Sequence, residues 1–299
     1  MPMRTRTALR LAGTGVLLGG GTLGYAALVE RNLFTLRRYD VPVLAPDAEP
    51  LRVLHLSDLH MMPGQRRKQD WVAALVATDP DLVVTTGDNL AHPDAVPAVQ
   101  RALAPLLELP GAFVFGSNDY RGPVFKNPFT YFFDNRPYRQ GVDLPTEELR
   151  DALTGAGWLD LNNARTVLKA GGRTVELVGV DDPHVARDDY AAVTGPATGD
   201  ADIHLGLTHS PEPEILHRMA ADGLDLLLAG HTHGGQVRVP GVGALVTNCG
   251  LDRRMARGLH RWPGSAAWLH VSAGLGTHPT APVRFACRPE ASLLTLIPR

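Results

Sequence analysis

Cysteine is scarce in this 299-residue sequence, which contains only Cys249 and Cys287. A metal site built on thiolates would lack close partners for either residue. The pair is compatible with one disulfide, which would fit an exported domain, and also with two free buried thiols. The sequence leaves that choice open, and it directs the search for metal ligands to other residue types.

A large net charge of either sign is also absent, since the formal net charge is −2 at pH 7. Proteins that mainly bind nucleic acid usually carry a strong basic field. We therefore expect no nucleic-acid partner, and no feature identifies a specific protein partner. With 44% hydrophobic and 20% charged residues, the composition is that of a globular chain that can bury a full core.

The N-terminus contains a long uncharged run from Leu11 to Val29. At about 1.5 Å per residue, a helix of this length would nearly span the hydrocarbon layer of a bilayer. We predict a single-pass membrane anchor over residues 1–38, which places the protein at the cell membrane and leaves its orientation undecided. The alternative is a signal peptide cleaved near Gly24-Tyr25-Ala26, which would give an exported protein.

Residues 39–50 contain three prolines and predict an extended linker. The remainder, residues 51–299, is predicted to form one domain. Its first part alternates apolar runs typical of strands with helical patterns, whereas the part after Gln236 consists of short strands and turns. This order predicts the α/β class with mixed sheets.

Polar residues directly follow four apolar, strand-like runs. These residues are Asp58 and His60, then Asp88, then His209, and finally the pair His231 and His233. In open α/β sheets, ligands bind outside the carboxyl ends of the strands. Because carboxylates and imidazoles are metal ligands, the pattern predicts one metal site, holding more than one ion, along that edge.

Five ordered blocks resemble the calcineurin-like metallophosphoesterase family. They are Asp58-x-His60, Gly87-Asp88, Gly116-Ser117-Asn118-Asp119, His209 and Gly230-His231-x-His233. The ending, with Gly274-Leu275-Gly276 and Pro282-Val283-Arg284-Phe285, is similar to the bacterial, membrane-associated branch of the family. The resemblance implies a metallophosphoesterase domain at 51–299, in which two facing mixed β-sheets are flanked by helices. The N-terminal transmembrane helix would be added to this α/β domain.

The resemblance also implies which residues hold which ion. The first metal would be held by Asp58, His60, Asp88 and His233, and the second by Asp88, Asn118, His209 and His231. These ligands suit two divalent or trivalent ions of Mn, Fe, Zn or Co. Such a pair activates a hydroxide for in-line attack on phosphorus, and the predicted catalytic residues are the bridging Asp88 and Asn118.

The block at residues 116–119 departs from the family pattern. The family normally has Gly-Asn-His followed by Asp or Glu, where the asparagine binds the second metal and the histidine aids protonation of the leaving group. Aligned without a gap, Ser117 takes the ligand position and Asn118 the histidine position. Either the loop shifts so that Asn118 reaches the metal, or the second site is weaker.

The implied substrate is a phosphodiester, a pyrophosphate or a phosphomonoester. The anchor and the aromatic segment 125–138 favour a lipid-linked compound, with the membrane as a further partner. The alternative is a metal-binding protein of the same fold with little or no turnover, acting as a binding or scaffold module.

Several other polar residues are weaker candidates. Asp181, Asp182 and His184 are expected either to contact substrate or to stabilise a turn, and Arg238 either to meet phosphate or to form a surface pair. His55 and His204 lie inside apolar runs, so they are interpreted as core histidines.

Overall fold

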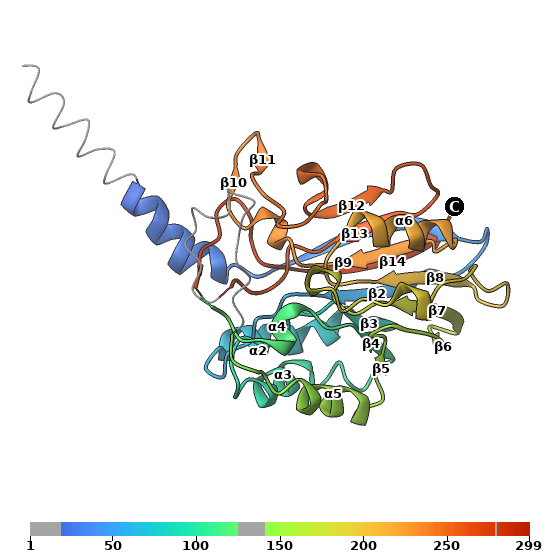
Figure 1. Cartoon of the computed structure of the whole chain (residues 1–299), viewed down its shortest axis with the longest axis horizontal. Helices are drawn as coiled ribbons and strands as arrows, with labels where there is room; N and C mark the ends of the chain where they lie inside the picture. The colour runs from blue at the N-terminus through green and yellow to red at the C-terminus, as the bar shows by residue number, and fades with distance from the viewer. Residues whose placement is uncertain (1–18, 125–140, 279) are drawn as a thin grey trace, which may run out of the picture.

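The computed structural model describes residues 19–124, 141–278 and 280–299, and it shows two facing six-stranded sheets with helices on their outer sides (Figure 1). In spatial order, the first sheet contains β1 (Thr35–Leu44), β14 (Glu290–Pro298), β2 (Leu51–Leu56), β3 (Leu82–Thr85), β4 (Gly111–Phe113) and β5 (Leu159–Asp160). The second contains β12 (Gly258–Arg261), β13 (Trp268–Val271), β9 (Leu226–Ala229), β8 (Ile203–Leu207), β7 (Arg173–Gly179) and β6 (Ala164–Ala170).

Both sheets are mixed. In the first sheet β14 runs antiparallel to β2, while β2, β3, β4 and β5 are parallel neighbours. In the second sheet β13, β9, β8 and β7 are parallel, and the edge strands β12 and β6 are antiparallel to their neighbours. The predicted fold of two facing mixed sheets flanked by helices is confirmed.

Helices cover the outer face of each sheet. The first sheet is covered by α2 (Arg66–Ala73), α3 (Val96–Leu103) and α5 (Thr146–Gly155), and the second by α6 (Pro213–Ala221) (Figure 1). The central strands β2 and β3 are apolar on both sides, because one face meets these helices and the other meets the second sheet. Continuous apolar runs that end in polar loops are therefore what the layering requires.

The predicted linker at 39–50 overlaps a strand. The edge strand β1 extends to Leu44 and pairs in parallel with β14. Pro42 lacks a backbone N–H, which an edge strand tolerates, and the register shifts between Pro42 and Leu44. Residues 39–44 are thus extended, as the prolines indicated, but they belong to the first sheet.

The predicted N-terminal transmembrane helix is wrong. Among the described residues, no helix has both the length and the apolar character needed to cross a membrane. Residues 1–18, which hold the first part of the predicted segment, lie outside the described residues, and so does the aromatic segment 125–138.

Polar contacts fix the end of that N-terminal segment to the domain. After a helical stretch at 19–24 come a π-helical turn (Tyr25–Val29) and a 3-10 turn (Glu30–Asn32). The carbonyl of Ala26 accepts from the N–H of Arg284 at 3.1 Å, and the Glu30 carboxylate accepts from the N–H of Cys287 at 2.6 Å. A hydropathy pattern cannot predict this contact, because it depends on the buried carboxylate of Glu30 accepting from a backbone N–H far along the chain.

Two histidines lie in the layer between the sheets. His55 on β2 and His270 on β13 are fully buried, and their Nδ1 atoms are 2.9 Å apart. Burial lowers the pKa of His55 from 6.5 to about 3, so the ring is neutral in the folded protein. His55 is thus placed in the core, whereas His204 on β8 is half-buried and binds Asp225 at 2.8 Å.

Neutral, buried His55 should make stability more sensitive to acid. Because folding lowers its pKa, its contribution is complete above pH 6.5 and is lost as the pH falls toward 3. Relative to His55→Gln, the metal-free wild type should lose about 1.4 kcal/mol of unfolding free energy between pH 7.5 and pH 5.5. Urea unfolding of both proteins in EDTA at the two pH values measures this loss, and a pH-independent difference would contradict it.

Candidate metal centre

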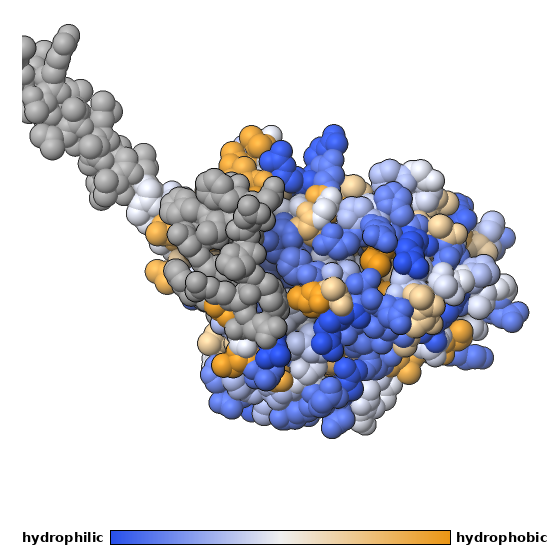
Figure 2. Space-filling view, in the orientation of Figure 1, coloured by the Kyte–Doolittle hydropathy of each residue, from blue (hydrophilic) through white to orange (hydrophobic). Residues whose placement is uncertain are grey.

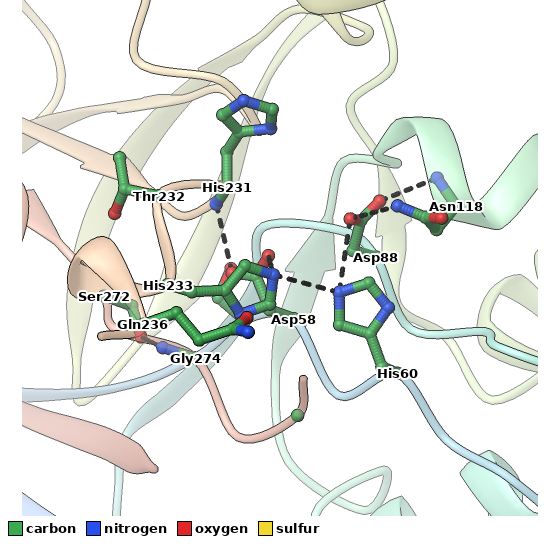
Figure 3. Close-up of polar contacts among 12 residues, drawn as sticks. Asp58, His60, Asp88, Asn118, His231, Thr232, His233, Gln236, Ser272 and Gly274 are labelled. Atoms are coloured by element: carbon green, nitrogen blue, oxygen red, sulfur yellow. Dashed lines mark hydrogen bonds and ion pairs between the residues drawn. The ribbon is translucent and has the colours of Figure 1, made fainter. Parts of the chain in front are cut away.

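The seven predicted ligands lie beyond the carboxyl ends of strands. Asp58 and His60 follow β2, Asp88 follows β3, Asn118 lies in the short helix α4 (Ser117–Tyr120) after β4, His209 follows β8, and His231 and His233 follow β9. Within each sheet these strands are parallel, so their carboxyl ends share one edge. Side chains from both sheets meet there, as Figure 3 shows.

Left-handed backbone conformations are concentrated at these residues. The φ angles are 49° at Asp58, 38° at His60, 54° at Asp88, 67° at His231 and 48° at His233. Residues other than glycine rarely adopt this backbone conformation, and those that are held in it cluster at functional sites. The fold therefore imposes sharp turns that direct these carboxylates and imidazoles into one space.

Glycines allow the loops to approach the Asp58 carboxylate closely. A Cβ on Gly230 would collide with the Ser57 hydroxyl, and one on Gly274 would lie 2.5 Å from the Asp58 Cβ. Gly274 also has a φ of 70°. Both loops pack directly onto the turn that carries Asp58.

The first group of candidate ligands comprises Asp58, His60 and His233, whose ligand atoms lie within 4.8 Å of one another. His60 Nε2 is 3.2 Å from His233 Nε2, which lies 3.6 Å from Asp58 Oδ1. Burial lowers the pKa of His60 to about 3 and that of His233 well below 6.5. Both imidazoles are therefore neutral, which is the form that binds a metal.

The second group comprises Asp58, Asp88 and His209, whose ligand atoms also lie within 4.8 Å of one another. His209 Nδ1 contacts the carbonyl of Thr86 at 2.6 Å, so this nitrogen carries the proton and donates it. The other nitrogen, Nε2, faces Asp88 Oδ2 at 3.4 Å. Burial alone would lower the pKa of His209, but the Asp88 carboxylate raises it well above 6.5.

Besides His60 Nδ1, two buried atoms in these groups have no hydrogen-bond partner among the described residues: Asp58 Oδ1 and His209 Nε2. A buried polar atom without a partner carries a desolvation cost of about 1–3 kcal/mol. Both atoms are of the kind that bind Mn, Fe, Zn or Co. The residues present therefore fit metal ions, as the sequence indicated, while the identity of the metal stays a prediction.

Asp88 belongs to the second group and also faces the first. Its Oδ2 is 3.5 Å from His60 Nε2 (Figure 3) and 3.4 Å from His209 Nε2, so it meets one imidazole from each group. Burial alone would raise the pKa of Asp88, but the imidazole of His209 holds it well below its usual value. The carboxylate is therefore ionised.

Asn118 and Ser117 occupy different surroundings. Asn118 donates to Asp88 twice, from its backbone N–H at 2.8 Å and from its side-chain amide at 2.7 Å (Figure 3). Ser117 instead donates its backbone N–H to Asp182 at 2.8 Å. The side chain of Asn118, at least, reaches the predicted bridging carboxylate.

We predict that Asn118→Ala weakens the second metal, while Ser117→Ala has little effect. The amide carbonyl of Asn118 becomes available to an ion once its side chain rotates away from Asp88. Loss of one neutral ligand should weaken affinity about 10–100-fold, on the scale seen for residues that orient metal ligands. Metal content after dialysis measures both variants, and a large loss from Ser117→Ala alone would reverse the assignment.

His231 lies at the periphery of the cluster. Its backbone N–H donates to Asp58 Oδ2 at 3.1 Å, and its Nε2 is 3.2 Å from the carbonyl of Asn248. Its ring centroid lies 5.3 Å from that of His209 and 4.5 Å from that of His184. Neither ligand group includes His231, so its role as a ligand stays a prediction.

The weaker candidates bind neighbouring loops. Asp182 accepts from the backbone N–H groups of Ser117 and His184, so it caps the 3-10 turn Pro183–Val185 and contacts the first residue of α4. Arg238 donates to the carbonyl of Gly234 at 2.8 Å. Both cysteines are free thiols, with Cys287 buried and Cys249 half-buried.

One functional neighbour that sequence reasoning did not single out is Arg284. Its guanidinium is fully buried and donates to the carbonyls of Ala273, Gly274 and Gly276. It also lies 3.4 Å from His233 Nδ1. The block Pro282-Val283-Arg284-Phe285 marked the position, but a single arginine without a periodic pattern gave no signal of burial.

A family model described as calcineurin-like phosphoesterase matches residues 51–235, the stretch that holds every predicted ligand. The chain therefore belongs to the calcineurin-like phosphoesterase family, which confirms the resemblance of the motifs. It is a hydrolase of phosphoric ester bonds, and the family depends on two metal ions.

The relatives with named activities include a phosphodiesterase and a pyrophosphatase. "Phosphodiesterase YaeI" of Escherichia coli (strain K12) is 28% identical over 92% of this chain and 92% of its own. "UDP-2,3-diacylglucosamine pyrophosphatase LpxG" of Chlamydia trachomatis is 25% identical over 90% of this chain and 91% of its own. Among solved structures, TT1561 of Thermus thermophilus matches with a TM-score of 0.43 and 15% identity, covering 76% of this chain and 91% of that one.

Proposed function

We propose that the protein hydrolyses a phosphate bond with a substituent on both sides of phosphorus, as in a phosphodiester or a pyrophosphate diester. The observation that carries the proposal is the pair of adjacent ligand groups, which share Asp58 and meet at Asp88. Two metal ions bound there would supply an activated water and neutralise charge on the phosphoryl group. The ligands would be the seven predicted residues, namely Asp58, His60, Asp88, Asn118, His209, His231 and His233.

The residues of this chain prepare the site before any substrate arrives. The carbonyl of Thr86 accepts the Nδ1 proton of His209, so Nε2 is the nitrogen that faces Asp88 and would bind an ion in exchange for its proton. Asn118 holds Asp88 from two donors, and the N–H of His231 holds one oxygen of Asp58. This arrangement positions the ligands without reorganisation, which is the main source of catalytic power in such sites.

The named relatives support a substrate with two substituents. One is called a phosphodiesterase and the other a pyrophosphatase. The block at 116–119 agrees with this preference, because it places no histidine where the family has its general acid. A substrate with a better leaving group than a simple alkyl phosphate needs less help from an acid.

A basic cavity adjoins the loop of the metal-binding histidines. It has a volume of about 530 Å³ and is lined by Arg238, Arg253 and Arg254 together with Asp252. Arg238 donates to the carbonyl of Gly234, the residue that follows His233. Guanidinium groups suit phosphate and carboxylate, which supports a substrate that carries a further anionic group.

Turnover of two chromogenic esters tests the proposal. The full chain, stripped of metal and titrated with Mn²⁺, should cleave bis(p-nitrophenyl) phosphate faster than p-nitrophenyl phosphate. Binding of two ions per chain without turnover of any ester would favour the alternative, a scaffold of the same fold. UDP-2,3-diacylglucosamine and UDP-glucose then separate a lipid-linked substrate from a soluble one.

A further inference from the structure

A line of five polar side chains connects the interior between the sheets to the Asp58 carboxylate. Its members are all fully buried: His270 on β13, His55 on β2, then Thr86, Ser57 and Asp58. The successive distances are 2.9 Å between the histidine Nδ1 atoms, 2.9 Å from His55 Nε2 to Thr86 Oγ1, 2.8 Å from Thr86 to Ser57, and 2.7 Å from Ser57 to Asp58 Oδ2. Each link is a hydrogen bond of ordinary length.

The direction of this chain is set at its Asp58 end. Asp58 Oδ2 accepts the backbone N–H of His231 at 3.1 Å and is therefore an acceptor. The Ser57 hydroxyl donates its single proton to the same oxygen, so its own oxygen accepts from Thr86. The proton of the Thr86 hydroxyl is thereby used, and the Thr86 oxygen accepts from His55 Nε2–H.

The same reasoning assigns the protons of both imidazoles. His55 is neutral because burial lowers its pKa to about 3, so with a proton on Nε2 its Nδ1 is an acceptor. His270 must then donate from Nδ1–H. Its pKa is also lowered, well below 6.5, which leaves Nε2 without a proton. That nitrogen is the one ring atom of the pair with no hydrogen-bond partner among the described residues.

We propose that His270, His55 and Thr86 are positioning residues that act through Ser57 on the Asp58 carboxylate, with His270 fixed as the Nδ1–H tautomer and His55 as the Nε2–H tautomer. The consequence lies at the carboxylate. Oδ2 is saturated by Ser57 and His231, whereas Oδ1 is buried without a partner among the described residues and faces His233. The chain thereby selects Oδ1 as the atom that binds metal.

The surroundings distinguish this role from simple packing. The layer between the sheets is otherwise mostly apolar, with residues such as Val53 and Leu228 around the chain. A histidine pair there is less favourable than well-packed aliphatic side chains unless every donor is satisfied. In the assigned direction every N–H and O–H of the chain has an acceptor, and only an unprotonated ring nitrogen is left over.

The tautomers can be read directly in the metal-free protein. Nitrogen-15 NMR of the full chain, labelled at histidine and kept in EDTA at pH 7.5, should show His55 protonated on Nε2 and His270 on Nδ1. His55→Gln and His270→Asn each remove one set of signals and give the assignments. A proton on His55 Nδ1, or averaging between the two tautomers, would overturn the proposal.

Threonine variants test the effect on the carboxylate. Thr86→Val has nearly the same shape but removes the hydroxyl, and it should weaken Mn²⁺ binding about 10–100-fold. Thr86→Ser keeps the hydroxyl and should restore affinity to within about threefold. The matched control is Thr85→Val, because the Thr85 hydroxyl is buried and has no hydrogen-bond partner among the described residues. Its Mn²⁺ affinity should equal that of the wild type.

The outcomes separate this inference from the proposed function, on whose metal site it rests. Equal Mn²⁺ affinities for Thr86→Val and Thr85→Val would refute the positioning role even in an active enzyme. The assigned tautomers in a protein without turnover would uphold the chain and count only against the hydrolase. Should Thr86→Val fail to fold, the NMR of the wild type still decides.

Discussion

Asp88→Asn is expected to lose both metal ions and at least about 10³-fold in turnover. Removing a single group that stabilises a transition state typically costs about 10²–10³-fold, and Asp88 meets one imidazole of each ligand group, His60 and His209. The substitution keeps the shape of the side chain but removes its charge. Elemental analysis after dialysis and the rate on bis(p-nitrophenyl) phosphate measure the two effects.

The control for this variant is Asp94→Asn. Asp94 lies on the same segment after β3 but is exposed, and its contacts are with His92. Its metal content and turnover should match those of the wild type. A full complement of metal in Asp88→Asn would show that this residue is not the bridge.

Arg284→Met is expected to destabilise the fold by about 3–5 kcal/mol, because several buried carbonyl groups lose their donor at about 1–3 kcal/mol each. Arg284 is fully buried, and its guanidinium donates hydrogen bonds to the carbonyls of Ala273, Gly274 and Gly276. Methionine fills the space but leaves these acceptors without donors. The midpoint of urea unfolding measures the loss.

Two further variants make the Arg284 experiment specific. Arg284→Lys keeps the charge but offers three donors from one point, so it should recover only part of the stability. Arg254→Met removes an exposed arginine that pairs with Asp252 and should leave the midpoint unchanged. If Arg284→Met also unfolds at the wild-type midpoint, the carbonyl cluster does not depend on this residue.

The proximity of most candidate metal ligands could be predicted from sequence because its signals are local. Each ligand sits within a few residues of an apolar run, and parallel strands in one sheet bring such ends together whatever the details of the loops. Asp58, His60, Asp88, His209 and His233 therefore needed only strand positions and family order to be placed near one another.

The supporting residues could not be predicted in the same way. The contact between His55 and His270 joins positions 215 residues apart on different sheets. The sequence of neither strand contains a pattern that predicts the other strand as its partner. Thr86 and Ser57 read as ordinary residues at strand ends. The transmembrane helix failed for a related reason, since the hydropathy of residues 11–29 cannot reveal that Ala26 and Glu30 are bound to the domain.

The left-handed backbones at five of the seven predicted ligand positions would tie the abundance of the protein to the supply of metal. Each such conformation costs on the order of 1–3 kcal/mol and persists only because the surrounding structure holds it. Ions that bind only the folded chain at about 100 times their Kd return about 2.7 kcal/mol. In a cell deprived of metal, the unfolded fraction would rise and proteases would remove it. Such a cell would hold fewer copies of the polypeptide, and not merely less active ones.

On the face of the domain seen in Figure 2, hydrophilic residues dominate and hydrophobic residues are scattered among them. Loss of the fold would expose the apolar layers that this face covers. Exposed apolar surface is what marks a chain for aggregation and degradation. A shortage of metal would thus lower the amount of the protein by exposing apolar surface that the folded chain buries.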